Sequence, residues 1–140
     1  MKTAKELYGE DGRGVSDYQP MLQEFGRIML QVDDHDYQGD SSVLYSAYDY
    51  GKRKTRIGYL NFGWGSCSGC DALQACDSVE EIQNLMDDLY ASIKWFDEES
   101  EVLEYFKQHD WKGDYGWGHD GTRRFVNAAI ALFSPRVDEE

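Results

Sequence analysis

Long apolar runs are missing from this sequence. The longest one covers only residues 128–133, whereas a membrane-spanning helix needs about 20 predominantly apolar residues. Residues 1–6 also lack the apolar segment that marks a signal peptide. We therefore predict a cytoplasmic protein that does not insert into a membrane.

Basic residues are also in short supply. Lys and Arg total 14 against 27 Asp and Glu, so the formal net charge is −13 at pH 7. A surface of this sign repels the phosphates of nucleic acids and of anionic membranes. The charge argues against direct binding of nucleic acid or membrane, and it favours a protein partner that has a basic surface.

Cysteine is scarce, and all three cysteines fall within residues 67–76. Their odd number and the lack of a signal peptide argue against structural disulfides. A tetrahedral zinc site needs four such ligands, and one histidine would have to complete the set, although none of the three has diagnostic spacing. The candidate metal ligands are Cys67, Cys70 and Cys76, with His35, His109 or His119 as the fourth.

The segment from Trp64 to Cys70 resembles the active-site turn of thioredoxin, because a C-x-x-C pair follows a predicted strand and precedes a predicted short helix. A thioredoxin-like site also needs a cis-proline loop and parallel strands. The only prolines, Pro20 and Pro135, do not supply that loop. Zinc binding and thiol redox chemistry at the three cysteines therefore stand as the alternative to a protein without cofactor.

The length and the apolar content fit one domain. A chain of 140 residues with 41% hydrophobic and 14% aromatic residues can build a packed core of ordinary size. We expect a single domain over residues 1–140. Residues 1–16, which are rich in glycine and charge, are predicted to form an irregular arm, and residues 136–140 a frayed tail.

The apolar pattern predicts both helices and strands. Residues 42–48 and 56–63 are rich in Val, Tyr, Leu and Ile and flank a turn-like segment, which is typical of an antiparallel hairpin. A third strand is expected at 27–32 or 93–96, because an isolated hairpin is marginal. Helices are predicted at about 18–33, with a strand at 27–32 as the competing prediction, at 79–93, at 120–133, and after Asp97. The predicted fold is α+β, a small antiparallel sheet on this central hairpin with three to four helices packed mainly on one face.

Charge is unevenly distributed along the chain. The predicted hairpin turn has four cations, Lys52, Arg53, Lys54 and Arg56. They either protect a solvated loop tip or bind an acidic partner, including another copy of the chain. The segment from Asp77 to Asp110 has eleven acidic residues against two lysines, so its helices have anionic outer faces.

Carboxylates and aromatic rings define the predicted partner-binding surface. Acidic side chains on two consecutive helices can engage the lysines and arginines with which a basic protein otherwise binds phosphate. Large rings in the glycine-rich loop after 108 are typical of binding surfaces. The alternative is a solvated acidic face that only maintains solubility. The candidate residues are Glu80, Glu81, Asp87, Asp88, Glu101, Glu104, Trp111, Tyr115 and Trp117.

Three segments carry a resemblance to other proteins: residues 62–76 (FGWGSCSGCDALQAC), 93–96 (IKWF) and 109–111 (HDW). They resemble a group of small uncharacterised proteins from phages and bacteria, over about residues 37–117. The resemblance implies no activity. It leads to the hypothesis of a non-enzymatic phage accessory protein in the host cytoplasm, whose anionic surface mimics nucleic acid and inhibits a host enzyme, defence effector or nucleic-acid-binding factor.

Overall fold

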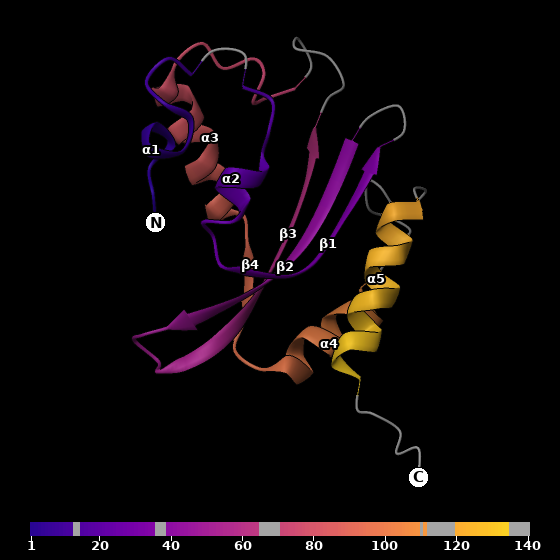
Figure 1. Ribbon diagram of the computed structural model, residues 1–140. Helices are drawn as coiled ribbons and strands as arrows, with labels where there is room; N and C mark the ends of the chain where they lie inside the picture. Colours follow the sequence, from indigo (N-terminus) through magenta and orange to yellow (C-terminus); the bar gives the residue numbers. More distant parts are fainter. Residues whose placement is uncertain (13–14, 36–38, 65–70, 110, 112–119, 135–140) are drawn as a thin grey trace.

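A four-stranded antiparallel sheet forms the centre of the protein (Figure 1). The computed structural model describes residues 1–12, 15–35, 39–64, 71–109, 111 and 120–134. The strands follow one another in the order β1-β2-β3-β4. Their bounds are Arg27–His35 for β1, Gly39–Asp49 for β2, Lys54–Trp64 for β3 and Lys94–Phe96 for β4. The predicted α+β class with a sheet built on the central hairpin is confirmed.

The central hairpin is longer than predicted, and its turn is fixed locally. β2 and β3 pair continuously from Gly39 and Trp64 at one end to Asp49 and Lys54 at the other. The Asp49 carboxylate accepts hydrogen bonds from the backbone N–H groups of Gly51, at 2.9 Å, and Lys52, at 3.2 Å. Aspartate is favoured at such positions because its side chain replaces a backbone acceptor.

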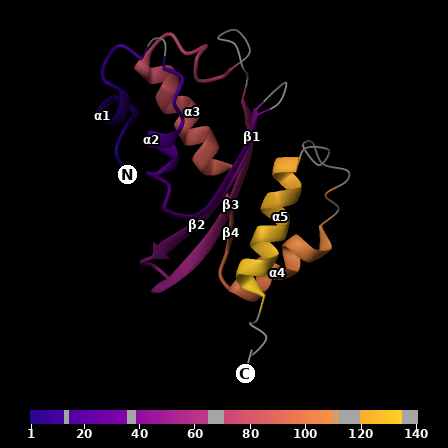
Figure 2. The same ribbon diagram turned by 45° about the vertical axis from the view of Figure 1, so that its right-hand side comes forward.

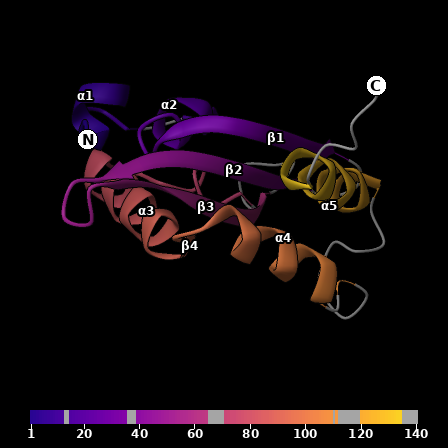
Figure 3. The same cartoon turned by 90° about the horizontal axis from the view of Figure 1, so that it is seen from below.

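Helices cover both faces of the sheet, as Figures 2 and 3 show. The prediction that they pack mainly on one face is wrong. Val43 and Tyr45 of β2 point to one face, where they join the core formed with α1 to α3, while Leu44 between them joins the core under α4 and α5. Both faces of the hairpin are apolar, so both need cover. The helices are α1 (Ala4–Tyr8), α2 (Gln19–Leu22), α3 (Val79–Ala91), α4 (Glu99–Gln108) and α5 (Asp120–Phe133).

The helix predicted at about 18–33 is wrong for most of its length. Only α2 is helical there, and β1 begins at Arg27. Leu22 and Phe25 pack into the core on the α1–α3 side, whereas Met29 and Val32 pack against the core on the α4–α5 side. The apolar residues at 22, 25, 29 and 32 are three or four positions apart, as on one face of a helix. They belong, however, to the end of α2, the link after it and the strand β1. The segments 27–32 and 93–96, predicted as alternatives for a third strand, both form strands.

The N-terminal arm is not irregular throughout. α1 is a short helix capped by Thr3, whose side-chain oxygen accepts a hydrogen bond from the Glu6 backbone N–H. Ala4 is fully buried, and its backbone N–H donates to the Gln83 side chain of α3 at 2.7 Å. α1 therefore packs on α3 as part of the fold. The predicted tail at 136–140 lies outside the described residues.

α3 and α4 begin with similar caps. Ser78 accepts a hydrogen bond from the Glu81 backbone N–H at 3.2 Å, as its S-x-x-E pattern predicts, although the Glu81 carboxylate accepts from the N–H of Asp77. At α4 the cap residue is Glu98, one position after the predicted Asp97. The Glu101 carboxylate accepts from the N–H groups of Asp97 and Glu98, both at 3.1 Å.

A helix that crosses a lipid bilayer must be long and predominantly apolar. Within the part of the chain that the structure describes, no helix has both the length and the apolar composition needed to cross one.

Candidate functional site

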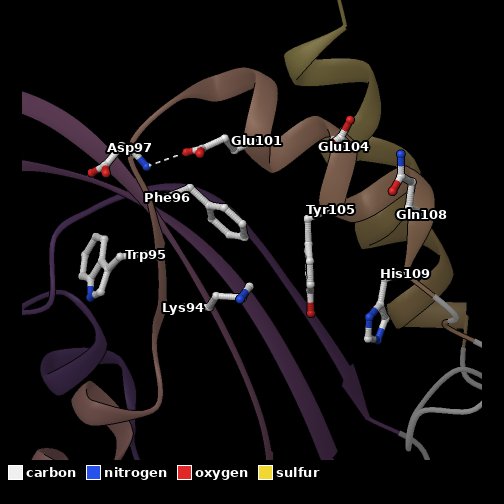
Figure 4. Close-up of a pocket in the computed structure, with 9 residues that line it drawn as sticks. All are labelled: Lys94, Trp95, Phe96, Asp97, Glu101, Glu104, Tyr105, Gln108 and His109. Carbon is white, nitrogen blue, oxygen red and sulfur yellow. Dashed lines mark hydrogen bonds between the residues drawn. The ribbon is translucent and has the colours of Figure 1, made fainter.

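A groove of 560 Å³ lies between β4 and α4 (Figure 4). Aromatic rings and carboxylates both line it, and a lysine extends into it. β4 contributes the residues at one wall and successive turns of α4 contribute the other. The lining residues are Lys94, Trp95, Phe96, Asp97, Glu101, Glu104, Tyr105, Gln108 and His109.

The strand and helix periods explain how these side chains meet. Lys94 and Phe96 are two residues apart on β4, so both lie on the same face of the sheet. Tyr105 and His109 are four residues apart at the end of α4, one turn above the other. The Phe96 and Tyr105 rings have their centres 5.5 Å apart and are tilted by 51°, so they form two adjoining walls.

The Lys94 ammonium lies against both of these rings. Its Nζ is 5.5 Å from the centre of the Phe96 ring and 5.4 Å from that of Tyr105. Figure 4 shows the Lys94 side chain extending past Phe96 toward Tyr105, while Trp95 points away from both. Cations are attracted to ring faces within about 6 Å because the ring quadrupole is negative there. The groove thus already binds a cation, its own.

The ring system continues into the core. The His109 ring is centred 5.1 Å from Tyr105 and 4.5 Å from Trp111. Trp111, which the sequence placed in the partner-binding surface, is only 7% exposed, stacks on Phe106 and donates its indole N–H to the Phe106 carbonyl at 3.0 Å. It supports the wall of the groove from behind. Tyr115 and Trp117, predicted with it, lie outside the described residues.

Three carboxylates border the groove, and each has a different environment. Asp97 accepts a hydrogen bond from Lys52 at 2.8 Å, and this bond is the main reason that the pKa of Asp97 is lowered. Glu101 caps the start of α4. Glu104 is exposed and makes no hydrogen bond or ion pair with another described residue. Glu104 is therefore available to a partner.

The structure separates the predicted acidic residues into two groups. Glu101 and Glu104 lie beside the groove on the α4 side of the sheet. The other four are on α3, which packs on the opposite face through Val79, Ile82 and Met86. The six carboxylates therefore do not form one continuous surface. The four acidic residues on α3, all of them exposed, are Glu80, Glu81, Asp87 and Asp88.

The basic hairpin is neutralised mostly within the chain. Lys52 pairs with Asp97, and Lys54 with Glu98 at the start of α4. The Arg56 guanidinium lies 4.2 Å from the centre of the Trp95 ring and 3.9 Å from the Asp49 carboxylate. Self-association through Lys52–Arg56 stays a prediction, and these contacts would compete with it.

Cys76 is the one cysteine within the described residues. It is buried, and its thiol donates to the carbonyl of Ala72 at 3.3 Å. Burial, with smaller contributions from Glu81, Asp71 and Asp77, raises the pKa of the thiol, which disfavours a reactive thiolate. Cys67 and Cys70 lie outside the described residues. In the described residues no group of three or more His, Cys, Asp or Glu could bind a metal ion, so the zinc site stays a prediction.

Sequence reasoning missed the groove residues Lys94, Phe96, Tyr105 and His109 as a set. The sequence does contain a signal for each pair. Lys94 and Phe96 are two positions apart on a predicted strand, and Tyr105 and His109 are four positions apart on a predicted helix, so each pair shares one face of its element. What the sequence did not show is that α4 passes β4 closely enough for Lys94 and Phe96 to face Tyr105 and His109.

Comparison with models of known protein families, with curated proteins and with solved structures gave no match to this chain. We therefore infer function from the geometry of the groove.

Proposed function

We propose that this protein is a non-enzymatic interaction module that binds a protein with a basic surface, and that it does so through the groove between β4 and α4. The observation that supports this most is that carboxylates, aromatic rings and a lysine ammonium lie together in the groove. Exposed carboxylates of α4 border two aromatic rings against which a lysine ammonium already lies. Carboxylates attract cations, and ring faces add a short-range attraction that solvated acids lack.

The net charge of −13 supports the same choice of partner. At ordinary salt a strongly anionic molecule attracts a cationic one up to a separation of about 10 Å, beyond which the attraction is largely screened. The partner class we propose is a host protein whose lysines and arginines otherwise bind phosphate, such as a nucleic-acid-binding factor or an enzyme acting on nucleic acid. Occupying those side chains would block phosphate binding and so inhibit the partner.

Two matched double variants test this proposal. Glu101→Gln with Glu104→Gln removes two charges beside the groove, and Glu81→Gln with Asp88→Asn removes two from α3. Glu81 and Glu101 both accept backbone hydrogen bonds at a helix start, and glutamine keeps that acceptor. The two variants therefore change net charge equally and preserve both caps.

Binding of oligolysine and oligoarginine peptides, measured by calorimetry at low salt, gives the readout. We expect the groove variant to bind about fivefold more weakly than the unmodified protein, and the α3 variant to lose less than half as much. Equal losses in both variants would show that binding follows net charge alone, and unchanged affinity in both would contradict an anionic binding surface altogether.

A further inference from the structure

The Lys94 ammonium has an unusual position for an exposed lysine. It lies within 5.5 Å of two ring centres, yet no described carboxylate lies within ion-pair distance of it, although Glu101 and Glu104 line the same groove. Lys94 is anchored on β4, on the floor of the groove. A cation that enters from solvent can contact the rings and the carboxylates together, which the tethered Lys94 ammonium does not do.

We propose, building on the proposed function, that Phe96 and Tyr105 form a cation seat and that Lys94 is its internal occupant. A lysine or arginine side chain of the basic partner displaces Lys94 and takes its place between the two rings. Phe96, Tyr105 and Lys94 define the seat, and Glu104 lines the same groove.

Displacement is physically undemanding. Lys94 is exposed and has a flexible four-carbon stem, so its ammonium can return to water by rotation about side-chain bonds. Packing supports the position of the Phe96 ring, which is only 9% exposed, and β4 pairs with β3 at that residue. Tyr105 is fixed by ring contacts to Tyr59 and Phe106. The seat is therefore preformed, and the partner does not have to order it.

The test removes the internal occupant. Lys94→Ala empties the seat, while Lys107→Ala on α4 makes the same change in net charge away from it. Lys107 is exposed and has no hydrogen bond or ion pair to another described residue. We expect Lys94→Ala to bind oligolysine or oligoarginine about threefold more tightly than Lys107→Ala does. The two peptides distinguish an ammonium from a guanidinium occupant.

A second set of variants separates seat occupancy from the loss of a nearby charge. In a Tyr105→Leu background one wall of the seat is gone, so Lys94→Ala should no longer improve binding relative to Lys107→Ala. In a Tyr105→Phe background the ring remains, and the improvement should return. Thermal unfolding of each variant shows whether it is folded, and if Tyr105→Leu is not, the comparison of Lys94→Ala with Lys107→Ala in the otherwise unmodified protein still tests the seat.

The outcomes distinguish this inference from the function on which it rests. Equal affinities of Lys94→Ala and Lys107→Ala, with the groove carboxylates still required, would overturn the cation seat and leave the anionic binding surface intact. An improvement that persists in Tyr105→Leu would also overturn it, because a charge effect would then explain the result. Tighter binding that depends on the ring supports it.

Discussion

The two faces of the sheet are built differently. On the α1–α3 face the core is mainly aliphatic, and hydrogen bonds join segments distant in the sequence, such as Ala4 to Gln83 and Tyr18 to Asp71. On the α4–α5 face the core is a cluster of rings in which Phe106 stacks on Trp111, with centres 5.4 Å apart. Carboxylates lie on the outside of both faces, and on the second face Glu101 and Glu104 line one groove together with Phe96 and Tyr105.

This difference is the reason we propose the α4 face, and not the α3 face, as the binding surface. The carboxylates of α3 point into water, where each ion pair with a partner contributes little. The carboxylates of α4 border a groove whose aromatic walls extend into the core. A cation bound there would meet ring faces as well as carboxylates, and the rings would add a short-range attraction. The predictions below test whether the two faces really differ in this way.

The largest effect is expected from removing a ring from the aromatic core. Phe106 is 1% exposed and contacts Tyr59, Trp111 and Phe125. Phe106→Ala should lower the free energy of unfolding by about 3–5 kcal/mol, through lost burial and the cavity left behind. Urea denaturation measures this. Leu132→Ala is the control, because Leu132 is 50% exposed, and an equal loss there would show that the cluster is not a core.

Two tyrosines on the α1–α3 face, Tyr18 and Tyr45, test how much its polar contacts contribute to stability. The Tyr18 hydroxyl donates to the Asp71 carboxylate at 3.0 Å and accepts from the Leu73 N–H at 3.2 Å. The hydroxyl of Tyr45 is buried without a hydrogen-bond partner among the described residues. Tyr18→Phe should therefore cost about 1–3 kcal/mol of stability, whereas Tyr45→Phe should be neutral or stabilising. Urea denaturation of both variants measures the two changes in the free energy of unfolding. A larger loss for Tyr45→Phe than for Tyr18→Phe would contradict the prediction.

The smallest predicted effect concerns the link between the hairpin turn and the start of α4. The hydrogen bond from Lys52 is the main cause of the lowered pKa of Asp97. Lys52→Met should raise that pKa toward the usual value of about 3.9. A folded-state pKa below the unfolded value means that the contribution to stability is present above about pH 4 and is lost as the pH falls through the folded pKa.

Carbon-detected NMR titration of the Asp97 carboxyl group gives the measurement. Arg53→Met, at an exposed position of the same turn, serves as the control and should shift the pKa less. If Lys52→Met left the Asp97 pKa unchanged, the contact between the turn and the start of α4 would not exist in solution.

The sequence predicted what local pattern determines. The hairpin followed from two β-rich runs around a turn, and α3 followed from an apolar stripe that begins at Val79 after the cap Ser78. The division of helices between the two faces was not predictable in the same way. It depends on Val43, Leu44 and Tyr45 being buried in succession, and a run of apolar residues does not show which helix covers which side.

The site was predicted in part, for a similar reason. Glu101 and Glu104 were identified from charge, and they do line the groove. Trp111 was assigned to the binding surface because large rings beside glycines often bind partners, but its indole N–H and ring are satisfied inside the core. The seat for a cation depends on the approach of α4 to β4, which is a tertiary contact without a signature in either segment alone.

NMR mapping with an oligoarginine peptide tests the central claim most directly, because it locates the binding surface without any substitution. The account predicts that, at low salt, the largest chemical-shift changes occur at Lys94, Phe96, Glu104 and Tyr105, and that they decline as salt is added. Changes centred on α3, or spread equally over both faces, would contradict it.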